Sequence, residues 1–139
     1  MRVIKNGKAY DSGDVTITAL GQIWDEVVEF SYSTSQEHQV NHTLGSNEAS
    51  SWSRGKITHQ ASITIMMNGV VALEKAAGGS LLAIKPFDIN ITFVDEFNEM
   101  VNDTVTCKFQ EQGRTINGEM GLSQQYNLFV IYNDYNNVK

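Results

Sequence analysis

The chain has 139 residues, which suits one domain built around a single core. Its net charge of −6 and isoelectric point of about 4.9 exclude tight binding to nucleic-acid phosphates, because such binding needs a basic surface. Charged residues make up only 19 % of the chain, below the roughly 25 % of ordinary soluble domains. A polar but uncharged exterior favours burial against copies of the same chain, since interface cores are depleted in charge. A β-rich monomer with a Thr-rich solvent face is the alternative.

The first fourteen residues begin with a turn signal. Asn6-Gly7 is flanked by Arg2-Val-Ile-Lys5 and Lys8-Ala-Tyr10 and predicts a type I′ hairpin, so we expect residues 1–14 to form an N-terminal hairpin or arm. The first residues lack an apolar stretch, and no run approaches the ~18 apolar residues of a membrane helix, so we expect no membrane insertion.

Two strands follow, both with a period of two. Residues 15–20 place Thr16 and Thr18 on the face opposite Val15 and Ile17. Residues 24–32 predict a longer strand. Its two expected faces are Val28, Phe30 and Tyr32 on one side and Asp25, Val27, Glu29 and Ser31 on the other.

The most informative stretch is the polar, glycine-punctuated segment 38–56. A short strand is expected at 37–43, so the loop itself runs from Thr43 to Gly55. A loop of this length is typical of a binding element. An exposed Trp in such a loop is typical of a partner anchor, and we expect Arg54 to pair with a neighbour's carboxylate. The alternative is that Trp52 folds back onto its own domain. The residues expected to contact another subunit are Leu44, Gly45, Trp52, Arg54 and Gly55.

One strand and the one convincing helix come next. Residues 57–65 alternate cleanly, with Thr58, Ser62 and Thr64 on the face opposite the isoleucines. Asn68 is a plausible N-cap for a helix over 69–77, which Gly78-Gly79 would end. The expected apolar stripe of this helix is Val70, Val71, Leu73, Ala76 and Ala77.

Three more strands are expected at 87–93, 101–109 and 125–132. The last is apolar on both faces and must therefore be covered on both sides. We expect residues 133–139 to form a flexible tail. The whole chain, 1–139, is thus expected to be a single all-β domain with one short α-helix, an antiparallel β-sandwich or half-barrel.

The residues give little support for catalysis, a metal or a cofactor. His38 and His42 lie roughly 13 Å apart if they are on a strand, too far to share an ion. The acidic run from Asp95 to Asp103 lacks the glycine of an EF-hand and is expected to be a solvated hairpin tip. No nucleotide-binding or nucleophile motif is present in the sequence. Cys107, the sole cysteine, is expected to be buried and inert.

The order of these elements resembles that of bacteriophage tail tube proteins, of the small single-domain kind found in contractile tails and tail-like particles. Four features carry the resemblance over most of residues 10–133. They are the long hairpin from Val15 to His42, the loop with Leu44-Gly45, Trp52 and Gly55 that leads into the alternating strand, the single helix, and the strand pair from Phe87 to Phe109 with a closing strand near 125–131.

This resemblance implies a structural virion protein that forms hexameric rings, in which strands from each subunit merge into one β-barrel, and rings stack into the tube through which DNA is ejected. It implies tail sheath, tape measure, baseplate and tail terminator proteins as partners, DNA that passes without specific binding, and a place in the virion tail after assembly in the host bacterial cytoplasm. An aqueous lumen suits the threonine faces. The residues expected to line it are Thr16, Thr18, Asp25, Glu29, Thr58, Ser62 and Thr64.

Two alternatives stay open. A tube protein of a secretion system or of a tail-like bacteriocin would share the fold. A β-sandwich or barrel that binds a carbohydrate or another small ligand would use Trp24 or Trp52 as a stacking platform.

Overall fold

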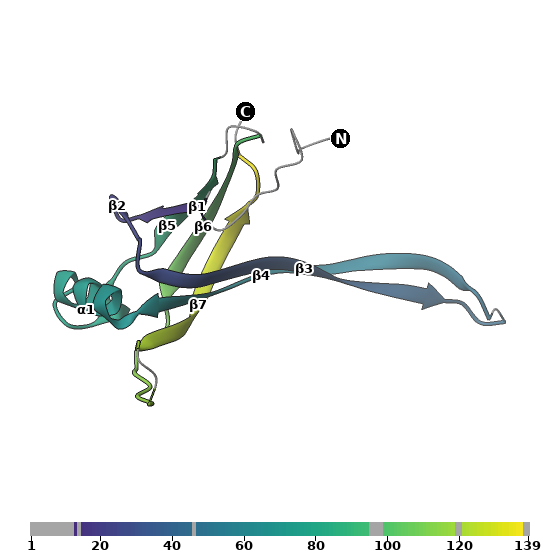
Figure 1. Cartoon of the computed structure of the whole chain (residues 1–139). Coiled ribbons are helices and arrows are strands. Elements are labelled where there is room, and N and C mark those ends of the chain that lie inside the picture. Colours follow the sequence, from purple (N-terminus) through teal and green to yellow (C-terminus); the bar gives the residue numbers. More distant parts are fainter. Residues whose placement is uncertain (1–12, 14, 46, 95–98, 119–120, 138–139) are drawn as a thin grey trace.

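A computed structural model describes residues 13, 15–45, 47–94, 99–118 and 121–137 (Figure 1). Strands account for 59 % of these residues, and they are accompanied by a single short α-helix. The expectation of an all-β chain with one short helix is therefore confirmed. Residues 1–12 and 14, most of the expected N-terminal hairpin, lie outside the described residues.

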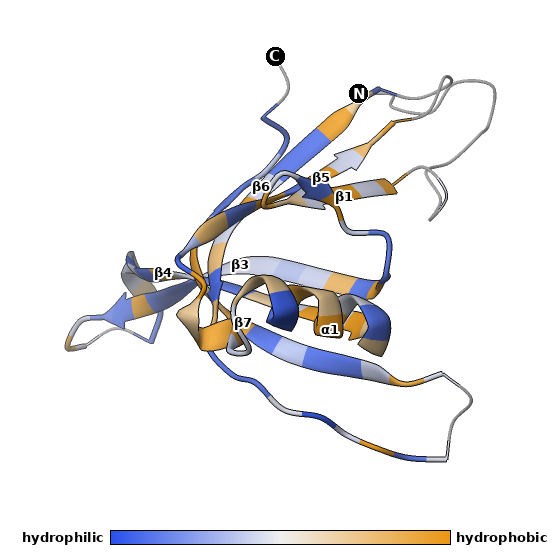
Figure 2. Ribbon diagram, turned by 90° about the vertical axis from the view of Figure 1, so that its left-hand side faces the viewer, coloured by the Kyte–Doolittle hydropathy of each residue, from blue (hydrophilic) through white to orange (hydrophobic). Residues whose placement is uncertain are grey.

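All strands belong to one antiparallel sheet of seven, in the order β2-β1-β5-β6-β7-β4-β3. The sheet is strongly bent, so that β3 and β4 cross the direction of β5 and β6 (Figures 1 and 2). Among the described strands, β2 and β3 are the two edges. The elements are β1 Val15–Ala19, β2 Gln22–Ile23, β3 Val27–His42, β4 Ala49–Met66, α1 Met67–Ala76, a 3-10 turn Leu81–Ala83, β5 Phe87–Phe93, β6 Val101–Phe109 and β7 Ser123–Asp134.

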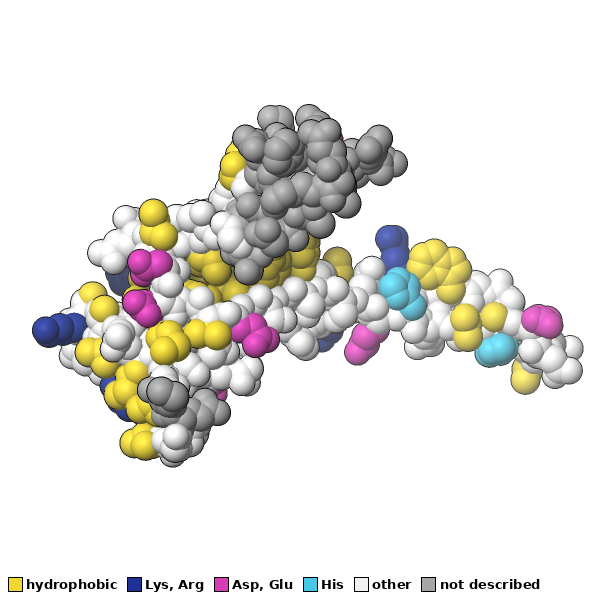
Figure 3. Space-filling view, in the orientation of Figure 1, with side chains coloured by type: hydrophobic (Ala, Val, Ile, Leu, Met, Phe, Trp, Pro, Cys, Tyr) yellow, Lys and Arg dark blue, Asp and Glu magenta, His cyan; other side chains and the backbone are white. Residues whose placement is uncertain are grey.

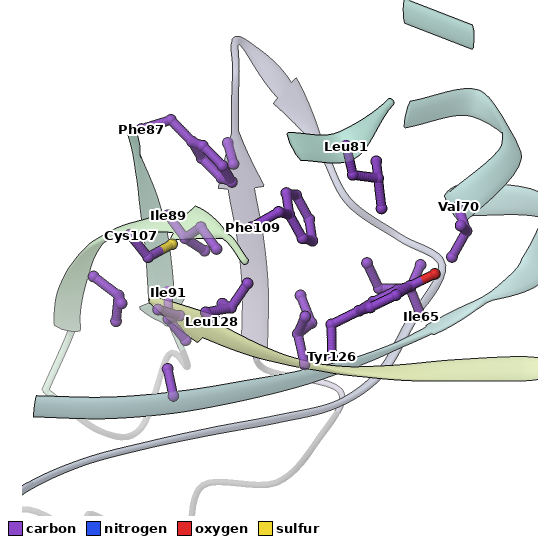
Figure 4. Packing of buried hydrophobic residues seen from close by; sticks show 14 residues of the cluster. Ile65, Val70, Leu81, Phe87, Ile89, Ile91, Cys107, Phe109, Tyr126 and Leu128 are labelled. Atoms are coloured by element: carbon purple, nitrogen blue, oxygen red, sulfur yellow. The ribbon is translucent and has the colours of Figure 1, made fainter. Parts of the chain in front are cut away.

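The core lies in the bend of the sheet, where α1 and the 3-10 turn close one end (Figure 4). Phe109 is 1 % exposed and its ring lies 5.7 Å from that of Phe87 and 5.9 Å from that of Tyr126. Leu81 and Val70 bring the 3-10 turn and α1 into the same cluster. Cys107 is fully buried and free, and burial raises the pKa of its thiol to about 12, so the expectation of a buried cysteine is confirmed.

Strands with clean alternation are found close to where they were expected. Strands 87–93 and 101–109 match β5 and β6, and 15–20 and 125–132 match β1 and β7 within one or two residues at each end. The helix begins at Met67 and has Met66 as its N-cap without a side-chain hydrogen bond, so the expected cap at Asn68 is wrong. On α1 the buried positions are Val70 and Glu74, whereas Val71 is 43 % exposed.

The largest correction concerns residues 24–56. The two strands expected at 24–32 and 37–43 are one strand, β3, and Trp24 precedes it. The segment 38–56, expected to contain a long loop, is instead a β-hairpin, because β3 pairs with β4 from Val27 to His42 and only residues 43–48 connect the two strands.

A β-bulge between Val27 and Glu29 also changes which side chains face the core. Val27 packs against the core together with Phe30 and Tyr32, while Val28 is 61 % exposed. The expected grouping of Val28 with Phe30 and Tyr32 is therefore wrong, because the bulge adds one residue and reverses the alternation.

The C-terminal segment is held against the sheet. Asn133 is buried and donates from Nδ2 to the Ser33 carbonyl oxygen at 2.9 Å. The Asn136 amide donates to Asp103 Oδ1 at 2.7 Å. The expected flexible tail from residue 133 is thus corrected for residues 133–137, and Asp103, expected at a solvated hairpin tip, is buried in β6 and accepts a hydrogen bond from the Tyr32 hydroxyl.

Candidate assembly surface

The β3–β4 hairpin projects far beyond the rest of the sheet (Figures 1 and 3). The pairing of β4 with β7 stops at Ala61, so residues 34–59, here called the arm, form a two-stranded ribbon. None of the described arm residues is buried. An isolated two-stranded hairpin is marginally stable in water. The arm is therefore expected to gain stability from contact with another surface.

The arm has two chemically different faces, because direct cross-strand partners share a face. One face continues the core side of the sheet outward, and we call it the Trp face. Its partner pairs are Gln36 with Ile57, His38 with Arg54, and Val40 with Trp52. The opposite face pairs Ser35 with Thr58, Gln39 with Ser53, and Asn41 with Ser51.

Three side chains on the Trp face form a compact unit. Trp52 is 63 % exposed, and its ring lies 5.8 Å from the His38 ring. The guanidinium carbon of Arg54 lies 5.9 Å from the centroid of the Trp52 ring, within the range of a cation–π contact. The indole is thus positioned before any partner binds, which reduces the entropy lost on binding.

A bulge between Gln36 and His38 keeps the Trp face continuous, because β4 contributes one extra residue there. Gly55 lies in this bulge. A Cβ added at Gly55 would lie 2.9 Å from the Cβ of Glu37, so only glycine fits without a shift of the neighbouring strand. The expected contact residues Trp52, Arg54 and Gly55 are therefore brought together, while Leu44 and Gly45 lie at the far tip, where Leu44 is fully exposed.

The residues expected to line a lumen share one face of the sheet, with one exception. The strand register places Thr16 opposite Thr92 and Thr18 opposite Asn90. The same face continues across β6 and β7 to Ser62 and Thr64 on β4. Glu29 lies opposite Thr64, and Thr58 lies on the same side further along β4. We call this surface the polar face. The exception is Asp25, which was expected on a strand and lies instead in the turn between β2 and β3.

Cross-strand hydrogen bonds connect the polar face. Thr92 Oγ1 donates to Asn102 Oδ1 at 3.0 Å, and Thr104 Oγ1 donates to Asn90 Oδ1 at 2.9 Å. Apolar side chains interrupt this face at β2, where Ile23 lies opposite Thr18 and is 66 % exposed, and near β7, where Phe129 is 54 % exposed beside Lys108. The expectation that β7 carries apolar residues on both faces is confirmed.

An apolar groove of about 370 Å³ lies at the opposite end of the molecule from the arm, between α1 and the β2–β3 connection. Trp24 lines it and packs on Phe87, with ring centroids 5.9 Å apart. We call it the α1 groove. Its lining comprises Leu20, Gln22, Ile23, Trp24, Asp25, Glu26, Ile65, Asn68, Gly69, Ala72, Leu73 and Ala76.

Several residues that hold the fold together carry no local sequence signal. Glu74 is 8 % exposed, accepts from Gln112 Nε2 at 2.6 Å and pairs with Arg114. Tyr32, Asp103 and Tyr135 meet at the base of the arm, where the Tyr32 and Tyr135 rings stack at 5.8 Å. These contacts join residues 38 to 103 positions apart, so spacing along the chain does not reveal them.

The structure assigns His59 a structural contact. It is half-buried, and its Nδ1 lies 2.9 Å from Thr34 Oγ1.

Within the described residues, no group of three or more His, Cys, Asp or Glu side chains is arranged to hold a metal ion. No helix in the described part of the chain is long and apolar enough to cross a membrane.

A comparison with protein-family models finds no match, and neither does a comparison with curated proteins.

Proposed function

We propose that this protein is a structural subunit that assembles with copies of itself into stacked rings, forming a tube of the phage tail-tube kind. The observation that carries the proposal is the arm, a ribbon that projects from the sheet with a preorganised Trp52–Arg54 pair. Trp and Arg are among the residues most enriched at energetic hot spots of interfaces. A subunit that binds its own copies through the arm would cover these exposed side chains.

The sheet provides the second support. Its edge strand β3 is sixteen residues long and has a paired neighbour on one side only, among the described strands. Long open edges promote pairing with another chain, and a closed ring removes them. Edge pairing between copies would extend the polar face from one subunit to the next.

The polar face provides the third support. It presents mostly Thr, Ser, Asn and Gln side chains, which suit a water-filled channel, and the chain's net charge is −6. Neutral or acidic walls do not bind DNA phosphates, so DNA would pass without being retained. Sheath, tape measure, baseplate and terminator proteins are the partners that such a tube requires.

One observation favours a second candidate, a module that binds a small ligand. The α1 groove is apolar, contains an aromatic ring from Trp24 and has a volume of about 370 Å³, within the usual range of ligand sites. Such a module would remain monomeric, which separates it from a tube subunit.

The test is electron microscopy of negatively stained protein over a concentration series, together with sedimentation. The full chain should form rings or tubes at high concentration. The matched control is a shortened arm, in which an Asn-Gly turn joins the cross-strand partners His38 and Arg54 and replaces the residues between them. Because no described arm residue is buried, this variant should fold and stay monomeric.

A full chain that remains monomeric at every concentration, pH and salt tested would overturn the proposal. Assembly of both proteins to the same extent would show that the arm is not the assembly element.

A further inference from the structure

We propose that the Trp face of one subunit's arm docks in the α1 groove of a second copy. This inference rests on the proposed self-assembly and names the surface that receives the arm. It joins two exposed apolar features of the described residues, which lie at opposite ends of the molecule (Figures 1 and 3).

The arm supplies an apolar stripe with one cation. Trp52, Val40 and Ile57 are each about 60 % exposed, at 63 %, 60 % and 57 %. Arg54 lies among them, against the indole ring. Figure 3 shows hydrophobic, basic and histidine side chains side by side on this part of the arm. A docking site for this stripe must be apolar and must offer a carboxylate.

The α1 groove has both properties. Leu20 and Ile23 are 50 % and 66 % exposed where they line it. Asp25 and Glu26 lie beside them, and neither carboxylate forms an ion pair with any residue that the structure describes. Arg54 entering the groove with Trp52 would meet these carboxylates, and an Arg–carboxylate contact shielded from water is stronger than an exposed one.

The groove is built with a fixed shape. The Met66 amide donates to the Glu26 carbonyl oxygen at 2.9 Å, which ties the β2–β3 connection to the start of α1. A Cβ added at Gly69 would lie 2.8 Å from the Cβ of Glu26, so glycine is needed for this close approach. A preformed groove binds with less loss of conformational entropy than one that must be ordered.

An arm cannot reach the groove of its own subunit. Trp52 and Ile65 are both on β4, and Ile65 lines the groove. Thirteen residues of strand separate them, which at ~3.3 Å per residue is roughly 40 Å. The occupant is therefore another copy, and the contact is head-to-tail. Such contacts use two different surfaces of each subunit and propagate until a ring closes or a filament forms.

The experiment combines two variants that each lack one half of the contact. Trp52→Ala removes the anchor of the arm, and Ala72→Arg places a bulky cation in the groove at an exposed helical position that tolerates arginine. Neither variant should assemble alone. Mixed in equal amounts, they should form a dimer that does not grow, because the intact arm of one enters the intact groove of the other. Sedimentation and mass photometry measure this dimer.

The control is Val71→Arg, which adds the same side chain to the neighbouring exposed residue of α1, outside the groove. It should assemble like the unmodified chain. As a second measurement, Arg54→Glu should block assembly, and combination with Asp25→Lys and Glu26→Lys should restore it by exchanging the charges.

The outcomes separate the two proposals. Absence of the mixed dimer, while the unmodified chain and Val71→Arg form tubes, would overturn the groove as the receiving surface and leave the proposed function standing. Normal assembly of Ala72→Arg alone would do the same. Failure of the unmodified chain to assemble under any condition would overturn the proposed function itself.

Discussion

Replacing Trp52 with alanine should abolish assembly and leave the folded subunit almost intact. Aromatic side chains bury about 150–250 Å² each when fully covered. Trp52 is 63 % exposed in the isolated subunit, so an interface that covers it would remove roughly 160 Å² of further surface from water. At ~25 cal/mol per Å² this burial contributes about 4 kcal/mol, which corresponds to about a thousandfold in the dissociation constant of one contact.

The cost to folding should be much smaller. The covered remainder of Trp52 touches His38 and Arg54 on the arm, not the core. Its loss should loosen the arm locally and leave the unfolding of the body unchanged. The assay is urea unfolding, followed by the signals of the body, together with sedimentation over a concentration series. We expect the same unfolding midpoint and an association that needs about a thousand times more protein.

Ile63→Val is the matched control. Ile63 is 1 % exposed in the core, opposite Phe30. Removing one of its methyl groups should lower the free energy of unfolding by about 0.5–1.5 kcal/mol and leave the arm unchanged. This control should be less stable and still form tubes. A Trp52→Ala protein that is destabilised but forms tubes at low temperature would refute the reasoning, because it would place Trp52 in an intramolecular contact.

Three further predictions follow from buried polar groups and from the polar face. Burial and the hydrogen bond to Asp103 raise the pKa of the Tyr32 phenol above its ordinary 10.0. The contribution of the protonated phenol to folding stability is therefore complete below about pH 10 and is lost as the pH rises above it. Tyr32→Phe should flatten the loss of stability at alkaline pH, measured by urea unfolding. Glu74→Gln should lower the free energy of unfolding by about 2 kcal/mol. This is less than the ~3–5 kcal/mol expected for breaking a fully buried ion pair, because the Arg114 side chain is 38 % exposed. In a double-mutant cycle, adding Arg114→Met should recover part of the lost stability. Glu29→Lys should leave tubes intact but retain DNA in them, which gel analysis of tubes after nuclease treatment would detect; tubes that retain no DNA would remove Glu29 from the channel wall.

The sequence alone was enough to locate the strands in which buried residues alternate without interruption. β5, β6 and β7 alternate buried residues with partly or fully exposed ones over most of their length, and their positions were predicted within a residue or two. Alternation of this kind is produced by burial of one face, so a strand that covers the core reveals itself. Glu74 and Asp103 were missed for the opposite reason. A buried carboxylate looks like a surface residue in the sequence until its partner, Arg114 or Tyr32, is known.

The arm was mistaken for a loop because two physical effects hid it. Its strands are rich in Ser, Asn and Gln, which have weak β-propensity and no core to cover. The bulge at Gly55 adds a residue, so Trp52 and Ile57 share a face although their spacing of five residues predicts opposite faces. The same contact residues were nevertheless singled out, because an exposed Trp beside an Arg indicates a contact whatever the backbone does.

The bulge also explains why this ribbon has a defined binding face at all. Without the extra residue at Gly55, Trp52 and Arg54 would turn away from the face that carries Val40, Ile57 and the core. With it, the side of the sheet that carries Phe30 in the body continues along the arm to Trp52 near the tip. Exposed apolar side chains such as Trp52 and Ile57 gain nothing in an isolated subunit, since water covers them. Its free energy is recovered only when another surface covers the arm, and this is the physical reason for regarding the arm as an assembly element.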